Sequence, residues 1–284
     1  MRLAEIERHV ASMEELQRIV GAMRAIASMR MQEALRALAS VRDYGHALAE
    51  AVDDALMIMG EQARFAVTHG PERRAGRGAV VLFAGEHGFV GGFNQRLMET
   101  LESDLKPTDT LMIVGSRGAA FAMERGHVAA CAHPLATRLA GITETVRLME
   151  EELLPRISRG EVVRVDVIFG RYDHSGAITI ERRRLFPLAV AAAGRKARGL
   201  APLHDLPAAE LLEKLTAEYM LAQLTEAATE ALAAENAARF AAMESARDNV
   251  GQKLDMLRLD VSRARQEEVT TELLDLITGV QTLR

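Results

Sequence analysis

The stretch FAAMESARDNVGQKLDMLRLDVSRA, residues 240–264, decides the fold. Its apolar residues recur at steps of three and four, with one polar step at Arg247. They are Phe240, Met243, Val250, Leu254, Leu257, Val261 and Ala264. A repeat of ~3.5 residues is typical of a helix that packs along a coiled-coil seam. The stretch therefore predicts a long helix that needs a partner.

The N-terminal region shows the same period. Its apolar positions are Leu3, Ile6, Val10, Met13, Leu16, Val20, Met23, Ala27 and Met31. Proline is excluded from helix interiors, and it is absent from Met1 to Gly70 and after Pro207. We expect one helix from Arg2 to about Met59 and another from Pro207 onward, roughly 85 Å and 115 Å long at ~1.5 Å per residue. Each chain end then supplies the partner of the other, as an antiparallel coiled coil.

A competing interpretation divides each end into shorter helices. The breaks would fall at Gly45, Gly251 or Gly279. One glycine costs only ~1 kcal/mol in a helix, so none of these residues forces a break. Both interpretations place helices at both ends of the chain.

The middle of the chain alternates between two patterns. Short apolar or β-branched runs predict strands over 78–84, 109–114, 161–169 and 177–181, and amphipathic stretches predict helices over 94–105, 117–125 and 143–154, the last stopped by Pro155. This alternation is typical of a parallel-leaning, Rossmann-like α/β domain. We therefore expect an N-terminal helix (1–59), a linker (60–77), the α/β domain (78–189), a second linker (190–206) and a C-terminal helix (207–284).

Composition excludes several classes of function. The net charge is −5 and the pI is near 6, whereas a nucleic-acid partner requires a cationic face. The only cysteine is Cys131, so no disulfide forms within a monomer. The N-terminus is amphipathic rather than a signal core, and no uncharged apolar run reaches the ~18–20 residues needed to span a bilayer. We expect a soluble protein that reaches any membrane through a partner.

The glycine-rich segment 85–94, between the first strand and the first helix, is the strongest local motif. Such loops can bind phosphate through bare backbone N–H groups. This one has neither a Gly-Lys-Ser/Thr sequence nor dinucleotide-fingerprint spacing, so a tight turn is the favoured interpretation.

Cys131 and His133 are two residues apart, but a metal needs three or four converging ligands. We therefore expect neither a metal nor a cofactor.

Two features of the terminal helices point to contact with other proteins, although each has a plain alternative. Arginines fall every six residues from Arg18 to Arg42 and so spread over several helix faces; this suits a shaft enclosed by partners, or a solvated surface. The segment 273–283 is strongly apolar, and such an end either inserts into a partner's hydrophobic collar or caps the protein's own coiled coil.

Several motifs together resemble the γ subunit of F-type ATP synthases. They are ENAARFAAM (235–243), ARDN (246–249), RARQ (263–266), VTTEL (269–273), QRI (17–19), AMR (22–24) and GFVGGFN (88–94). The resemblance covers nearly the whole chain. The sequence departs from the family pattern at Val20-Gly21, usually Thr-Lys, at Gly85-Glu86-His87, typically Ser-Asp-Arg, and at Ser262, usually Asn.

The resemblance implies a central-stalk rotor subunit that couples ion flow through a membrane ring to ATP synthesis or hydrolysis, without catalysing either reaction itself. It implies contacts with a ring of three α and three β subunits, with ε and with the c-ring, on the cytoplasmic side of a bacterial plasma (inner) membrane. By matching position, the contacts to the α/β ring would be Met23, Arg24, Arg263, Arg265, Gln266, Thr270 and Glu272. The alternatives are the corresponding subunit of a second, sodium-translocating ATPase, a nucleotide-using enzyme with helical appendages, and an unrelated coiled-coil scaffold.

Overall fold

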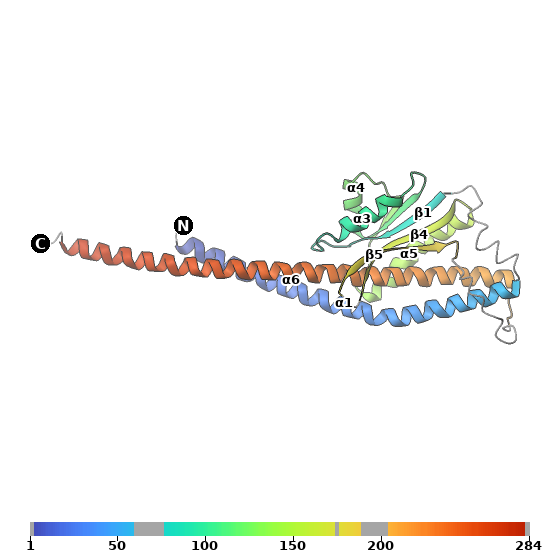
Figure 1. The fold of residues 1–284 in the computed structure, drawn as a ribbon, viewed down its shortest axis with the longest axis horizontal. Helices are drawn as coiled ribbons and strands as arrows, with labels where there is room; N and C mark the ends of the chain where they lie inside the picture. The colour runs from blue at the N-terminus through green and yellow to red at the C-terminus, as the bar shows by residue number, and fades with distance from the viewer. Residues whose placement is uncertain (1–2, 60–76, 174–175, 189–203, 282–284) are drawn as a thin grey trace. The chain divides into compact units, whose positions relative to one another are not determined.

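Two long helices lie at the two ends of the chain. The structure is a computed structural model that describes residues 3–59, 77–173, 176–188 and 204–281, with the side chains of Glu272 and of residues 275–281 outside that description. Helix α1 runs over Leu3–Met59 and α6 over Ala208–Gln281 (Figure 1). Both pass through the glycines that could have divided them, so the long-helix interpretation is confirmed.

The chain divides into two compact units. The first comprises Met1–Ile26 and Phe240–Arg284, and the second comprises Ala27–Arg239. This division cuts both helices internally, so the five-segment division expected from the sequence stays a prediction. The expected linkers, 60–77 and 190–206, fall almost entirely outside the described residues.

In the first unit, the two helices run antiparallel. Inter-helix ion pairs join Glu7 to Arg265 at 2.7 Å and Glu14 to Arg258 at 2.9 Å, so residue numbers rise along one helix as they fall along the other. The buried apolar seam between them contains Ile6, Val20, Met243, Val250, Leu254 and Leu257. The predicted antiparallel coiled coil is confirmed here.

Leu16 is a correction to the expected seam. Its side chain is 39% exposed. Met13 and Val20 are seven residues apart on the seam, and the inward position between them falls at half-buried Gln17. Leu16 therefore points outward.

In the second unit, the remaining parts of the two helices also pair antiparallel. The guanidinium of Arg42 lies 3.4 Å from the carboxylate of Glu226, and the Tyr44 hydroxyl donates to Glu218 at 2.6 Å. A small apolar cluster lies where α1 ends and α6 begins, and it contains Val52, Ala55, Leu56, Leu188 and Leu212.

The second unit also contains a five-stranded sheet in the order β3-β2-β1-β4-β5. The strands are β1 (Arg77–Phe83), β2 (Thr110–Val114), β3 (Cys131–His133), β4 (Val162–Tyr172) and β5 (Ile178–Phe186). The first four are parallel, and β5 is antiparallel to β4. Strand β1 is central, and its residues from Gly78 to Phe83 are buried, as a strand covered on both faces requires.

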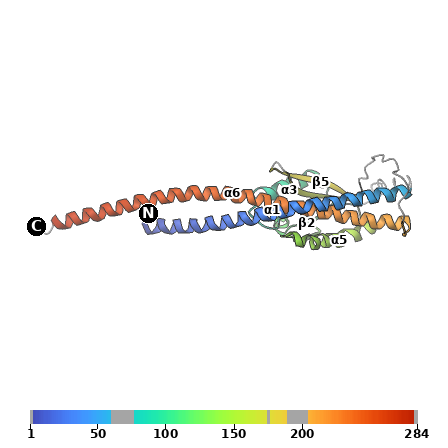
Figure 2. The same cartoon turned by 90° about the horizontal axis from the view of Figure 1, so that it is seen from below.

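Helices cover both faces of this sheet (Figures 1 and 2). One apolar cluster joins the sheet to α3 (Phe93–Asp104) and α4 (Ser116–Glu124). The other joins it to α5 (Ile142–Ser158), preceded by a 3-10 turn at Leu139–Gly141, and to α6. The expected central α/β domain is confirmed, and α6 is part of its core.

Three local predictions need correction. Pro155 does not stop α5, which continues to Ser158; the residue is exposed, and its carbonyl accepts the N–H of Arg159 at 3.2 Å, so the last turn closes without a proline donor. Strand β5 is longer than 177–181 because its whole length pairs with β4. Strand β3 was not predicted, since its three residues are too few to show a period.

Candidate partner interface

The contact residues expected on the coiled coil all lie in the first unit, but they form two bands rather than one site. Met23 and Arg24 are on α1, and the others are on α6 between Arg263 and Glu272. Arg24 pairs with Glu244 on α6, whereas Arg265 pairs with Glu7 on α1. At ~1.5 Å per residue, the step along α1 from Glu7 to Arg24 separates the bands by about 25 Å.

The first band is centred on Arg24. Its Nη1 donates to Glu244 Oε2 at 2.5 Å, and its guanidinium carbon lies 5.7 Å from the centroid of the Phe240 ring. Arg24 keeps about a third of its side chain exposed, and neighbouring Met23 is half-buried. The helix pair therefore holds the cation in one orientation while leaving it accessible to a partner.

The second band lies on α6. Arg265 pairs with Glu7 and is 63% exposed, and Arg263 lies 3.7 Å from Asp260 and is 76% exposed. Gln266 and Thr270 are exposed, and the Thr270 hydroxyl donates to the Gln266 carbonyl at 2.7 Å. Glu272 belongs to α6, with its side chain outside the description. These polar groups face solvent and can bind another chain.

Exposed apolar side chains also lie on the same helices, and the sequence reasoning missed them as site residues except for Leu273 and Leu274 of the apolar segment 273–283. They are Leu16, Ile19 and Ile26 on α1, and Met256, Leu259, Val269, Leu273 and Leu274 on α6, each between 39% and 60% exposed. Ile19, Ile26, Met256 and Leu259 show in the sequence as apolar residues out of step with the seam. Clustered apolar exposure is typical of protein–protein contact surfaces. Val269, Leu273 and Leu274 are exposed, but the other side chains of the apolar segment 273–283 lie outside the described residues, so the choice between a partner's collar and a cap on the coiled coil stays a prediction.

The glycine-rich loop is held by a carboxylate of α6. Glu235 accepts the N–H of Glu86 at 3.2 Å and that of His87 at 3.1 Å, and it pairs with Arg239 at 2.5 Å. Gly85 donates to Asn94 Oδ1 at 2.9 Å. An anion would have to displace a buried carboxylate from these donors, which favours the tight-turn interpretation over phosphate binding.

The carboxylate of Glu86, a residue of the loop itself, also holds the loop in place. Glu86 accepts the backbone N–H and the hydroxyl of Ser116, each at 2.8 Å, and the N–H of Leu135 at 2.9 Å. These bonds tie the loop to the start of α4 and to the segment after β3. The Gly-Glu-His variant therefore has a structural role in this chain.

A cavity of about 430 Å³ lies in the second unit between α1, β4, β5 and α6. Arg42, Arg171 and Arg183 line it, and each of them pairs with a carboxylate of Glu181, Glu226 or Glu230. Burial raises the pKa of Glu230 above its ordinary value, although Arg42 and Arg171 oppose the shift. The glutamates balance the charges of these arginines within the protein, so the cavity is lined by an internal ion-pair network and is not an anion-binding site.

No described helix is both long and apolar enough to cross a membrane.

The helix pair and its exposed bands define a class of protein. It is a subunit whose two chain ends form an antiparallel helix pair, with outward bands of charged and apolar surface that suit binding to other chains. The chain belongs to the γ-subunit family of ATP synthase, because the family model described as ATP synthase matches residues 2–283. The resemblance noted in the sequence is confirmed.

Solved structures of ATP synthases share this fold. A chain from the Euglena gracilis mitochondrial ATP synthase (OSCP/F1/c-ring, rotational state 3) aligns with a TM-score of 0.66 at 16% identity, over 99% of this chain and 94% of that one. A chain of the Euglena gracilis mitochondrial ATP synthase rotor in rotational state 1 aligns with a TM-score of 0.63 at 14% identity, over 94% of this chain and 98% of that one. A chain of the Tetrahymena thermophila mitochondrial central stalk and c-ring aligns with a TM-score of 0.57 at 14% identity, over 80% of this chain and 99% of that one.

Proposed function

We infer that the chain is the central-stalk rotor subunit of an ATP synthase, which couples ion flow through a membrane ring to ATP synthesis or hydrolysis on an α3β3 ring. The observation that carries this inference is the family match over nearly the whole chain, on a fold whose two ends pair within one chain. A scaffold that dimerises through its long helices would leave those ends to pair between chains.

The helix pair suits transmission of torque. Its seam is buried and its flanks are cross-linked by ion pairs in both units. A rotating shaft acts by contacting each catalytic subunit differently as it turns, which shifts each subunit between conformations. The exposed charged and apolar bands of the first unit supply different surfaces for such contacts.

Met23, Arg24, Arg263, Arg265, Gln266, Thr270 and Glu272 are our proposed contacts with the α3β3 ring. Support comes from the exposure of the described α6 members and from the partial exposure of Met23 and Arg24. We further propose that Val269, Leu273 and Leu274 insert into an apolar collar of that ring, because they are exposed next to the polar band.

We propose that catalysis belongs to other chains of the assembly. In the described residues, the charged groups around the cavity and the loop are occupied by one another, as in structural ion-pair networks. Association with ε and with the c-ring would place the chain at the cytoplasmic face of a bacterial plasma membrane, held there through its partners.

Reconstitution tests the proposal. The purified chain is mixed with α and β subunits from the same source, resolved by size exclusion, and assayed for ATP hydrolysis. We expect a complex of three α, three β and one copy of this chain, with hydrolysis that rises on its addition. Separate elution, with hydrolysis unchanged by the chain, would overturn the inference.

A further inference from the structure

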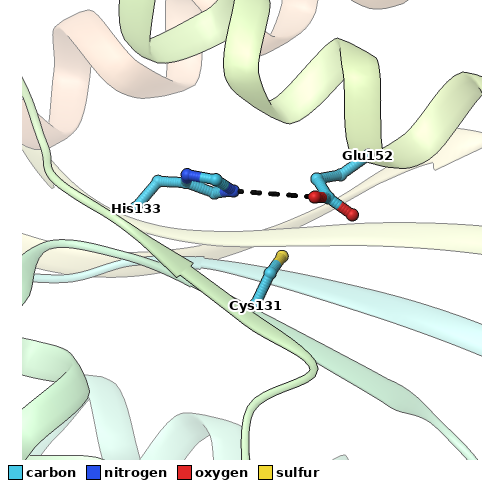
Figure 3. Close-up of side chains that lie close together, drawn as sticks. All are labelled: Cys131, His133 and Glu152. Carbon is cyan, nitrogen blue, oxygen red and sulfur yellow. Dashed lines mark ion pairs between the residues drawn. The ribbon is translucent and has the colours of Figure 1, made fainter.

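Three potential metal ligands converge beside the edge strand of the sheet. Cys131 and His133 are in β3, and Glu152 is on α5. The Sγ, imidazole nitrogen and carboxylate oxygen all lie within 4.8 Å of one another. Figure 3 shows the three side chains turned toward one shared space.

The backbone explains how they meet. Residues two apart on a strand point to the same face, so Cys131 and His133 share a face while Ala132 points away. The parallel pairing of β3 with β2 fixes their positions, with Met112 opposite Cys131 and Val114 opposite His133. Cys131 packs on the same apolar cluster as Met149 and Leu153 of α5, which places Glu152 over this strand.

The donor atoms are available and oriented. His133 Nε2 is buried without a hydrogen-bond partner and lies 4.0 Å from Glu152 Oε1. The other oxygen of Glu152 is engaged by Arg156 one turn along α5. Such an outer partner fixes a ligating carboxylate, so Oε1 is held toward His133 and Cys131.

We propose that Cys131, His133 and Glu152 form a Zn²⁺ site, with water in the fourth position. A thiolate, an imidazole and a carboxylate together suit this borderline-soft ion. Tetrahedral zinc at its usual bond lengths sets its donors roughly 3.4–3.6 Å apart, so modest side-chain rotation closes the present spacing. The side chains of His133 and Glu152 are 22% and 31% exposed, so solvent reaches part of both.

Metal binding would anchor β3 to α5. This strand has three residues and pairs on one side only, because it lies at the edge of the sheet. Burial raises the pKa of the Cys131 thiol, and Glu152 raises it further while Arg156 opposes them. A bound cation would lower the pKa of this thiol instead, because the thiolate is the form that ligates. None of the observations behind this site depends on the proposed rotor function.

Cobalt titration tests the site on the full-length chain, prepared without a tag and kept reduced. Cys131 is the only cysteine, so a thiolate-to-cobalt charge-transfer band can come from no other residue of this chain. We expect one Co²⁺ per chain, tetrahedral visible bands and their displacement by Zn²⁺. Cys131→Ser should abolish the charge-transfer band.

Two further variants and a control keep the test decisive. His133→Gln and Glu152→Gln should each lower the Co²⁺ affinity at least ~10-fold, since even outer-shell changes reach that size. His127→Gln is the matched control, because His127 also lies near a glutamate, Glu102, at 3.0 Å; its affinity should equal that of the wild type. Absence of the band with Co²⁺ in excess, or equal affinity in the wild type, His133→Gln and Glu152→Gln, would overturn the proposal.

Discussion

Arg24 Nη1 and Glu244 Oε2 lie 2.5 Å apart and join the two helices of the first unit. The side chains are 34% and 39% exposed, and an ion pair at this exposure contributes only ~0–1 kcal/mol to folding. Its consequence for a central-stalk subunit is therefore orientation: the carboxylate holds the guanidinium where a partner can reach it.

Two variants separate that role from folding. We expect Arg24→Ala to weaken binding to the α3β3 ring, with the free energy of unfolding of the isolated chain changed by no more than ~1 kcal/mol. Glu244→Gln keeps the cation and, in its amide oxygen, an acceptor that can still orient it, so this variant should retain most of the binding. Titrating each variant into the ring and following ATP hydrolysis gives the comparison; equal losses would show that only the intramolecular pair matters.

The apolar residues near the C-terminal end of α6 give a second prediction. Val269 and Leu273 are each 55% exposed, so the double change Val269→Asp, Leu273→Asp should alter the stability of the isolated chain by only about 0.5 kcal/mol. Assembly with α and β should be lost, because charges would enter an apolar collar. Size exclusion of the mixture measures this, and normal assembly would rule out the collar.

Lys106→Asp is the control for charge in that experiment. It changes the net charge by as much as the double variant does, since a cation becomes an anion. Lys106 is exposed and lies in the second unit, between α3 and β2. We expect this variant to assemble normally.

Gly170 on β4 gives a prediction about packing. A Cβ there would come within 2.6 Å of the Phe93 ring and 3.0 Å of the Ala234 Cβ on α6. Overpacking of this kind costs typically ~1–3 kcal/mol, so Gly170→Ala should destabilise the second unit by that amount in denaturant unfolding. Gly251→Ala is the control: its Cβ meets nothing within 4 Å, and it should stabilise α6 by up to ~1 kcal/mol. Equal stability of the two variants would contradict the close approach of β4 to α6.

The buried carboxyl of Glu230 gives a prediction about pH. Burial raises its pKa in the folded state, so the folded protein binds the proton more tightly than the unfolded chain does. Its contribution to stability is present below the unfolded pKa and is lost as pH rises through the folded pKa. The wild type should therefore gain stability relative to Glu230→Gln as pH falls toward the ordinary glutamate pKa of about 4.3.

Denaturant unfolding at several pH values measures this difference. The exposed substitution Glu99→Gln controls for the loss of a carboxylate elsewhere in the second unit. If instead the wild type loses stability relative to Glu230→Gln as pH falls, the arginines outweigh burial at Glu230.

The helices were predictable because their causes are local. Apolar residues seven positions apart, such as Met13 and Val20, specify a helix with one inward face when the stretch contains no proline. This holds whichever part of the chain packs against that face. Apolar runs such as 78–84 likewise indicate buried strands. Leu16 shows the limit, because the period alone does not decide which of two adjacent positions faces inward.

The fixed loop and the proposed metal site could not be predicted in this way. Glu235 meets the N–H groups of Glu86 and His87 only after α6 has packed against the sheet. Glu152 meets Cys131 and His133 only through the register of α5 over β3. Such contacts join residues far apart in the chain, and nothing in local periodicity specifies them.

Single-molecule rotation tests the central claim most directly. A probe is attached through Val128→Cys in a Cys131→Ser background, because Val128 is 90% exposed in the second unit, and the reconstituted α3β3 ring is fixed to a surface. We predict stepwise rotation of the probe in one direction when ATP is added, and none without ATP. A probe that only fluctuates while the same complexes hydrolyse ATP would contradict the assignment of this chain as the rotor.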